Sequence, residues 1–166
     1  MNAIRAREPA SAINRARVIT AKAHRLHYWG TGSGHRVVQG QPVFVYGTLK
    51  RGMANHAWLQ RERFLSEAAL PGAWLYDLGP FPMAVLAPSP GAEAAVRGEV
   101  FAVSAAALDA LDRLEGAPRL FERHWLELST GEPAWVYLGR SHQVRHSPRI
   151  TSGCWQRPGR AERWTA

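Results

Sequence analysis

The sequence predicts an α+β fold. Short apolar runs of strand-like composition follow one another with only brief turns between them, and only two segments carry helical periodicity. A doubly wound parallel sheet would need a helix between successive strands, so the clustering of strands argues against that architecture. With 166 residues, the chain is long enough for one domain with its own hydrophobic core.

The first predicted strand covers residues 43–47 and opens into a tight turn. The alternating apolar residues end at Gly47, a hydroxyl residue follows, and then come Lys50 and Arg51. Gly47 has no Cβ and can adopt a positive φ, so the backbone N–H groups after it can point at one spot. A concavity of amides binds a carboxylate or an oxyanion, although many simple hairpins contain a similar strand–Gly–Thr turn.

The remaining elements follow in order along the chain. Helices are predicted over residues 54–64 and 104–115. Glu99 lies in a predicted strand and is expected to point outward. Further strands are predicted from apolar and β-branched runs bounded by Gly, Pro or Asp, over residues 73–76, 82–86, 96–103, 124–129 and 133–138.

The second helix has clear end signals. Ser104 is placed as its N-cap, and Gly116 follows it as the glycine that commonly ends a helix. Its leucines recur at helical spacing and form one apolar face, at about 100° per residue.

Of the three carboxylates on this helix, Glu115 is turned most nearly toward the apolar face. It lies about 60° from the centre of that face, whereas Asp109 points away from it and Asp112 lies well to its side. Burial raises the pKa of a carboxyl group, and so does the negative end of a helix. Glu115 is therefore a candidate general base. The alternative is a residue at the edge of the core with its carboxylate in water.

The net charge of +8 is concentrated at the two ends of the chain. Residues 1–40 carry +6 and residues 140–166 carry +5, whereas residues 41–139 carry −3. Charged tails are more often solvated than specific for nucleic acid, so no specific nucleic-acid partner is expected. No membrane partner is expected either, because no apolar run approaches the ~20 residues of a spanning helix.

The cysteine and histidine content limits the chemistry of the chain. A single cysteine, Cys154, excludes an internal disulfide and suits the reducing cytoplasm, which is the predicted location. No base motif surrounds it, so we interpret Cys154 as a packed thiol rather than a nucleophile. His142 and His146 lie four residues apart in a stretch rich in Pro and Arg, and no metal site is predicted.

The charge pattern also suggests the domain boundaries. Residues 1–40 are predicted to form a basic, poorly ordered extension, followed by a domain over 41–157 and a tail over 158–166. The extension is amphipathic, rich in Arg and poor in acidic residues, as an organellar transit peptide would be. A disordered arm, or translation from an upstream start codon, would give the same composition.

Several short motifs together resemble the gamma-glutamylcyclotransferase-like family, also called AIG2-like, and within it the gamma-glutamylamine cyclotransferase branch. The resemblance spans about residues 42–155. It rests on Tyr-Gly-Thr-Leu at 46–49 and on four later blocks in the family's order, at 72–82, 98–101, 108–115 and 150–155. In one departure, many relatives carry Tyr-x-Arg where this chain has Phe121-Glu122-Arg123, so the ring is kept and the hydroxyl is absent.

The resemblance implies a small, mixed, partly closed β-barrel with flanking helices. It also implies an enzyme that releases an amine from a gamma-glutamyl amide and forms 5-oxoproline without a cofactor. Glu115 would be the catalytic base, and the substrate would be held by Tyr46, Gly47, Thr48, Leu49 and Arg123. The alternative is a non-catalytic module of the same fold that binds a small ligand, with basic tails that contact nucleic acid or an acidic partner.

Overall fold

The computed structural model describes residues 40–89 and 94–156. Residues 1–39 of the predicted extension and the whole predicted tail lie outside this part of the chain. In chain order the described elements are β1 (Gln41–Val45), the 3-10 turn η1 (His56–Leu59), β2 (Arg63–Pro71), β3 (Ala73–Asp77), β4 (Pro82–Leu86), β5 (Ala95–Val103), α1 (Ala105–Leu114), β6 (Glu122–Glu127), β7 (Pro133–Leu138) and η2 (Ser141–Gln143).

Five strands form one mixed sheet in the order β2-β5-β1-β7-β6. β1 lies at its centre, antiparallel to β5 and parallel to β7. Side chains of a strand alternate between the two faces of a sheet. Accordingly Phe44 packs in one hydrophobic cluster, while Val43 and Val45 pack in the other, which includes the leucines of α1. The chain therefore leaves β1 from a position enclosed by the core.

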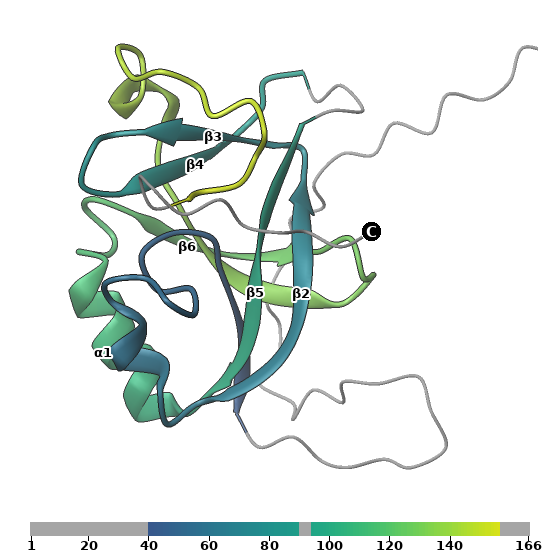
Figure 1. Ribbon diagram of the computed structural model, residues 1–166, viewed down its shortest axis with the longest axis vertical. Coiled ribbons are helices and arrows are strands. Elements are labelled where there is room, and N and C mark those ends of the chain that lie inside the picture. Colours follow the sequence, from purple (N-terminus) through teal and green to yellow (C-terminus); the bar gives the residue numbers. More distant parts are fainter. Residues whose placement is uncertain (1–39, 90–93, 157–166) are drawn as a thin grey trace, which may run out of the picture.

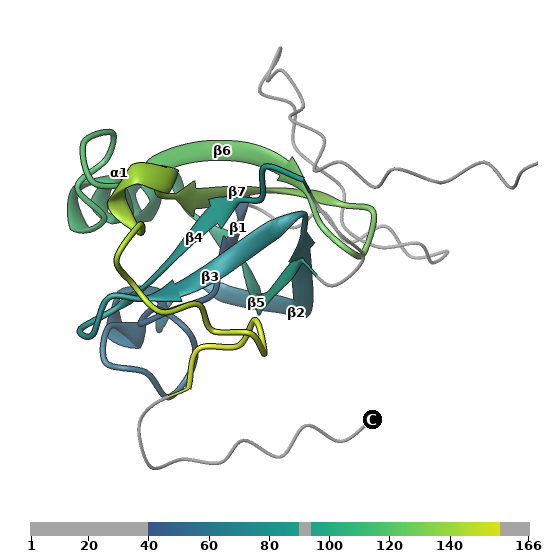
Figure 2. The same ribbon diagram turned by 90° about the horizontal axis from the view of Figure 1, so that it is seen from above.

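β3 and β4 form a separate hairpin across one end of the sheet (Figure 1). Seen from above, it lies between β6 and β7 on one side and β2 and β5 on the other (Figure 2). Isolated backbone hydrogen bonds, rather than a ladder, join this hairpin to the sheet. The Gly139 amide donates to the Ala84 carbonyl at 2.9 Å, and the Gly72 amide donates to the Ala94 carbonyl at 2.6 Å.

The sheet is not closed into the barrel that the family resemblance implied. β2 and the turn after β6 are joined at Ser129, whose amide and hydroxyl both bond to the backbone of Ala69. Two bonds from one residue do not make a ladder, and β3 and β4 pair with each other rather than completing the ring. The result is an open sheet covered by a hairpin and, in the described part, by one α-helix.

The helix predicted over residues 54–64 is wrong. The chain forms only the short 3-10 turn η1 and then enters β2, a nine-residue strand that the sequence prediction missed. The side chain of Asn55, before η1, makes no capping bond and donates instead to the hydroxyl of Thr48. β2 pairs with β5 along its length, and this long-range pairing takes residues 63 and 64, the end of the predicted helix, into the sheet.

α1 confirms the predicted second helix. Ser104 caps it, with its hydroxyl accepting from the Ala107 amide at 3.3 Å, and Gly116 follows at a φ of 60°. Leu108 and Leu111 are buried, as the apolar face predicted. No helix in residues 40–89 and 94–156 has both the length and the apolar character needed to cross a membrane.

Candidate active site

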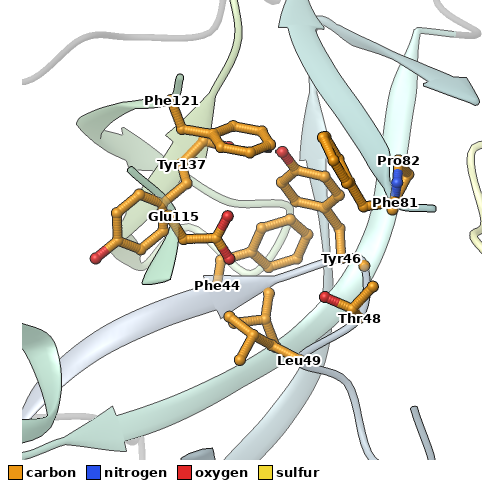
Figure 3. A pocket seen from close by; sticks show the side chains of 11 residues that line it. Phe44, Tyr46, Thr48, Leu49, Phe81, Pro82, Glu115, Phe121 and Tyr137 are labelled. Carbon is orange, nitrogen blue, oxygen red and sulfur yellow. Dashed lines mark hydrogen bonds between the residues drawn. The ribbon is translucent and has the colours of Figure 1, made fainter. Parts of the chain in front are cut away.

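A small cavity, partly open to solvent, lies where β1 ends (Figure 3). Its walls come from β1, the turn after it, the start of β4, the end of α1 and β7. Of the residues that the sequence predicted for the site, five line it and Arg123 does not. The lining residues are Phe44, Val45, Tyr46, Gly47, Thr48, Leu49, Phe81, Pro82, Glu115, Phe121 and Tyr137.

One wall of the cavity is the turn over residues 47–50. The Lys50 amide donates to the Gly47 carbonyl at 3.2 Å and closes the turn. The Asn55 amide donates to the Thr48 carbonyl at 2.9 Å, and the Asn55 side chain donates to the Thr48 hydroxyl at 3.1 Å. The amides of Thr48 and Leu49 donate to no acceptor in the described part of the chain. They are available to an anionic group in the cavity.

The requirement for glycine at position 47 is one of space rather than of backbone conformation. Gly47 is not among the glycines with positive φ, contrary to the reason that the sequence suggested. A Cβ placed on it would lie 2.8 Å from Cγ and 3.0 Å from Cδ of Pro82. The ring of Pro82, at the start of β4, therefore packs directly against the turn and holds it close to the cavity.

Two further contacts brace the same turn. The Glu99 side chain is only 12% exposed, and its carboxylate accepts both the Arg51 amide and Arg51 Nε at 2.9 Å. The sequence predicted that Glu99 points outward. Its carboxylate is instead bound to Arg51. Lys50 is buried, and its Nζ donates to the Trp155 carbonyl at 2.8 Å. The turn is thus fixed at its C-terminal side by a carboxylate and by a buried lysine.

Glu115 faces this turn from the end of α1. It is the C-cap of the helix, with its amide bonded to the Leu111 carbonyl at 2.8 Å. Burial raises the pKa of its carboxyl group from 4.5 to about 7. Within the described residues no hydrogen bond or ion pair reaches this carboxylate. The predicted inward orientation is confirmed, and the group is poised to exchange a proton near neutral pH.

Tyr46 lines the cavity with its ring, but its hydroxyl is already used. Tyr46 Oη donates to the Tyr137 carbonyl at 2.7 Å and accepts from the Ala84 amide at 3.2 Å. Burial raises the pKa of this phenol above its usual range. The residue therefore ties the end of β1 to β4 and β7, and it shapes the cavity rather than offering a free hydroxyl to a ligand.

Arg123 lies beside the cavity lining, in a cluster with Asp112 and Tyr137. Arg123 Nη1 donates to Asp112 Oδ2 at 2.8 Å, and Tyr137 Oη donates to Asp112 Oδ1 at 2.6 Å. Burial, and then the bond to Asp112, raise the pKa of the Tyr137 phenol. Asp112 therefore anchors the last turn of α1 to β6 and β7, just before Glu115.

We expect Asp112→Asn to lower the free energy of unfolding by about 1–2 kcal/mol, because it weakens hydrogen bonds that involve a charged group. Asp109→Asn is the matched control, since Asp109 is exposed on the same helix, and it should change stability by less than about 0.5 kcal/mol. Urea unfolding of both variants measures the difference. Equal effects would contradict an anchoring role for Asp112.

Phe121, which stands where many relatives have a tyrosine, places its ring in the wall of the cavity. It is buried, lines the cavity, and its ring lies 6.0 Å from that of Phe81 between centroids. The sequence predicted neither Pro82 nor Tyr137 as a site residue, and it suggested Phe81 only as one of several aromatic residues that would suit a pocket wall. Apolar and aromatic residues of this kind are usual in any core, and only the fold shows which of them face a cavity.

Cys154 lies outside the cavity lining. It is buried, and its sulfur is 3.9 Å from Lys50 Nζ. Among residues 40–89 and 94–156, no group of three or more His, Cys, Asp or Glu side chains is arranged to hold a metal ion.

The chain matches known proteins over most of the described region. Residues 43–157 match the family model described as gamma-glutamyl cyclotransferase, AIG2-like. A Vibrio cholerae protein named "Putative gamma-glutamylcyclotransferase" is 39% identical over 114 residues, covering 68% of this chain and 93% of that protein. The gamma-glutamylcyclotransferase family protein YtfP of Escherichia coli K12 is 32% identical over 113 residues, covering 68% and 94%.

Solved structures agree on the architecture. An AIG2-like protein from Mus musculus superposes with a TM-score of 0.58 at 24% identity, covering 72% of this chain and 90% of that one. The solution structure of E. coli ytfP superposes with a TM-score of 0.53 at 30% identity, covering 72% and 99%. The first likeness shows the fold alone, while the family model and the sequence relatives show membership. The chain belongs to the AIG2-like gamma-glutamylcyclotransferase family.

Proposed function

We propose that this protein is a gamma-glutamylcyclotransferase-type enzyme, which releases an amine from a gamma-glutamyl amide and forms 5-oxoproline. The observation that carries the proposal is the pairing of two features in one cavity. The partly buried Glu115 carboxyl has a pKa of about 7, and it faces a turn whose amides at Thr48 and Leu49 have no acceptor in the described residues. One feature moves protons and the other binds negative charge.

The proposed reaction needs only the substrate and the side chain of Glu115. The α-ammonium of the glutamyl group gives a proton to the Glu115 carboxylate, and the free amine attacks the γ-carbonyl carbon. A bond forms between this nitrogen and the γ-carbonyl carbon. The bond between that carbon and the amide nitrogen of the leaving amine then breaks. Glu115 returns this proton to the departing amine nitrogen, and its carboxylate then carries the second proton of the ring nitrogen to the released amine, which leaves as an ammonium ion. The lactam nitrogen keeps one hydrogen, and the Glu115 carboxylate is regenerated. The step consumes no oxidant, reductant or other co-reactant.

The turn supplies the complementary half of the site. Backbone amides that are fixed before the reaction stabilise an oxyanion without the cost of reorienting solvent. The amides of Thr48 and Leu49 would hold either the developing oxyanion or the α-carboxylate of the substrate. Because ring closure is intramolecular, holding the glutamyl chain in its cyclising rotamer supplies a further part of the acceleration.

The test is 5-oxoproline release from purified protein with gamma-glutamyl methylamide. We expect amine and 5-oxoproline to form in equal amounts, and kcat/KM to rise with pH as Glu115 loses its proton near pH 7. The α-glutamyl methylamide is the control, because its amide carbonyl cannot form the five-membered ring. Binding of gamma-glutamyl amides without any turnover would contradict the enzyme and favour a ligand-binding module.

A further inference from the structure

Two phenylalanine rings lie near each other in the wall of the cavity. Phe81 comes from the β3–β4 turn and Phe121 from the loop between α1 and β6, and their centroids lie 6.0 Å apart. Both residues line the cavity, and Figure 3 shows their rings together on the side away from Leu49. Phe121 is buried, whereas Phe81 is partly exposed.

Each ring stands on a braced loop. In the turn that carries Phe81, the Gly79 amide donates to Asp77 Oδ1 at 2.7 Å and the Leu78 amide donates to the Phe81 carbonyl at 3.1 Å. In the loop that carries Phe121, Arg140 donates to the carbonyls of residues 118 and 119 and pairs with Glu122. The two rings therefore form a fixed wall, and side chains that are already ordered lose little entropy when a ligand packs on them.

The cavity carries very little charge besides Glu115. Of its eleven lining residues, Glu115 is the one whose side chain is ionised near neutral pH. The two tyrosine hydroxyls are bonded elsewhere, that of Tyr46 to a backbone carbonyl and that of Tyr137 to Asp112. Thr48 presents one hydroxyl. Neither a cation nor a second carboxylate is available in this lining to pair with a charged substrate group.

We infer that the amine released by this enzyme is uncharged and apolar beyond its reacting nitrogen, such as an alkyl or arylalkyl amine, and that Phe81 and Phe121 select it. The inference rests on the proposed function. Phe81 and Phe121 are then residues that determine specificity, and the phenylalanine at position 121 favours this class because it adds no polar group to the wall.

The few polar groups of the cavity determine how the substrate must lie. The glutamyl head occupies the polar groups, since its amine must reach Glu115 and its anionic oxygen must reach the amides of Thr48 and Leu49. The rest of the cavity wall, which would contact the amine part of the substrate, is largely aromatic. A cationic group packed against this wall would lose part of its hydration without gaining a partner, because Glu115 is needed as the base. An anionic group at the same place would lose hydration in the same way.

The first experiment compares two amides of nearly equal shape on the unmodified protein. Gamma-glutamyl pentylamide and gamma-glutamyl (4-aminobutyl)amide differ in one terminal group, which is a methyl in the first and an ammonium in the second. We expect kcat/KM for the pentylamide to be at least about tenfold higher, within the range that one group in an apolar pocket contributes. Gamma-glutamyl benzylamide should also exceed the methylamide, because its ring can pack on the phenylalanine pair.

The second experiment tests the two residues through a ratio. Phe81→Leu should lower the ratio of kcat/KM for the benzylamide to that for the methylamide by about tenfold, because an aromatic contact is lost. Phe121→Tyr keeps the ring and its packing, and it should narrow the gap between the pentylamide and the aminobutylamide. Trp58→Leu is the control, since Trp58 is exposed and lies outside the cavity lining, and it should leave the benzylamide ratio unchanged.

The outcomes separate the two proposals. If the methylamide yields 5-oxoproline but the aminobutylamide equals or exceeds the pentylamide, the inference about the amine is overturned and the enzyme activity stands. If no gamma-glutamyl amide yields 5-oxoproline, both are overturned. The comparison of amides on the unmodified protein decides the question even if a phenylalanine variant fails to fold.

Discussion

Glu115→Gln is expected to lower the rate of 5-oxoproline release by about 10²–10⁴-fold, the usual cost of losing a general base. Glutamine keeps the shape of the side chain and cannot take a proton from the substrate. Because the carboxylate has no partner within the described residues, its replacement breaks no hydrogen bond of the fold. The loss should therefore appear in kcat, with the circular dichroism spectrum unchanged.

The same variant should be more stable than its parent at neutral and alkaline pH. Burial raises the pKa of Glu115 from 4.5 to about 7, so the unfolded chain loses this proton at a lower pH than the folded protein. Below pH 4.5 the group is protonated in both states and burial of its charge costs nothing. As the pH rises from 4.5 to about 7, the parent loses stability, on the order of 3 kcal/mol in total. Glutamine does not ionise and avoids this loss.

Two measurements check these results for Glu115. Single-turnover assays with gamma-glutamyl methylamide give the rate, and urea unfolding between pH 4 and pH 8 gives the stability difference, which should grow with pH. Asp109→Asn removes an exposed carboxylate from the same helix and should keep both the activity and the stability of the parent. Full activity in the Gln variant would exclude Glu115 as the base.

Gly47→Ala is expected to lower activity by about 10²-fold, because a shift of about 1 Å in a positioned group has effects of this size. The new Cβ would lie 2.8 Å and 3.0 Å from two ring carbons of Pro82, and the shorter distance is one that real Cβ atoms essentially never show. Since Pro82 is held in β4, the turn must move, and the amides of Thr48 and Leu49 move with it. Steady-state kinetics with gamma-glutamyl methylamide measure the loss.

A second substitution tests the cause. Pro82→Ala removes the ring carbons that the new Cβ would meet, so the double variant Gly47→Ala/Pro82→Ala should regain activity relative to Gly47→Ala alone. Gly131→Ala is the control, since Gly131 lies in the turn between β6 and β7 and a Cβ there would meet no atom within 4 Å. It should cost stability through its φ of 80° but leave kcat unchanged. If the double variant is no more active than the single one, contact with Pro82 is not what requires glycine.

The sequence predicted those features that are local along the chain. Ser104, the leucines and Gly116 define the ends and the buried face of α1 by themselves, and the position of Glu115 on that helix follows from its angular spacing. The sequence also predicted the turn after β1, because a glycine and a hydroxyl residue interrupt an apolar run. The motifs around these two elements were enough to indicate the family.

The sequence did not predict those features that depend on distant pairing. The segment over residues 63–71 lacks a strong strand pattern, and β2 forms there because β5 offers it a long antiparallel partner. The open sheet follows from the pairing of β3 with β4, which local composition does not determine. Glu99 in its strand gave no sign that it would accept the amide of Arg51, a residue 48 positions away.

For the site, the sequence by itself determined the chemistry of its two halves, a carboxylate at a helix end and a turn with free amides. Only the tertiary structure decided how they meet. It placed Arg123 on Asp112 beside the cavity, gave the hydroxyl of Tyr46 a structural role, and set Phe81 against Phe121. The reason is physical. Helix ends and turns are governed by neighbours in sequence, whereas the pKa of Glu115 and the apolar wall arise from burial, which requires the whole packed fold.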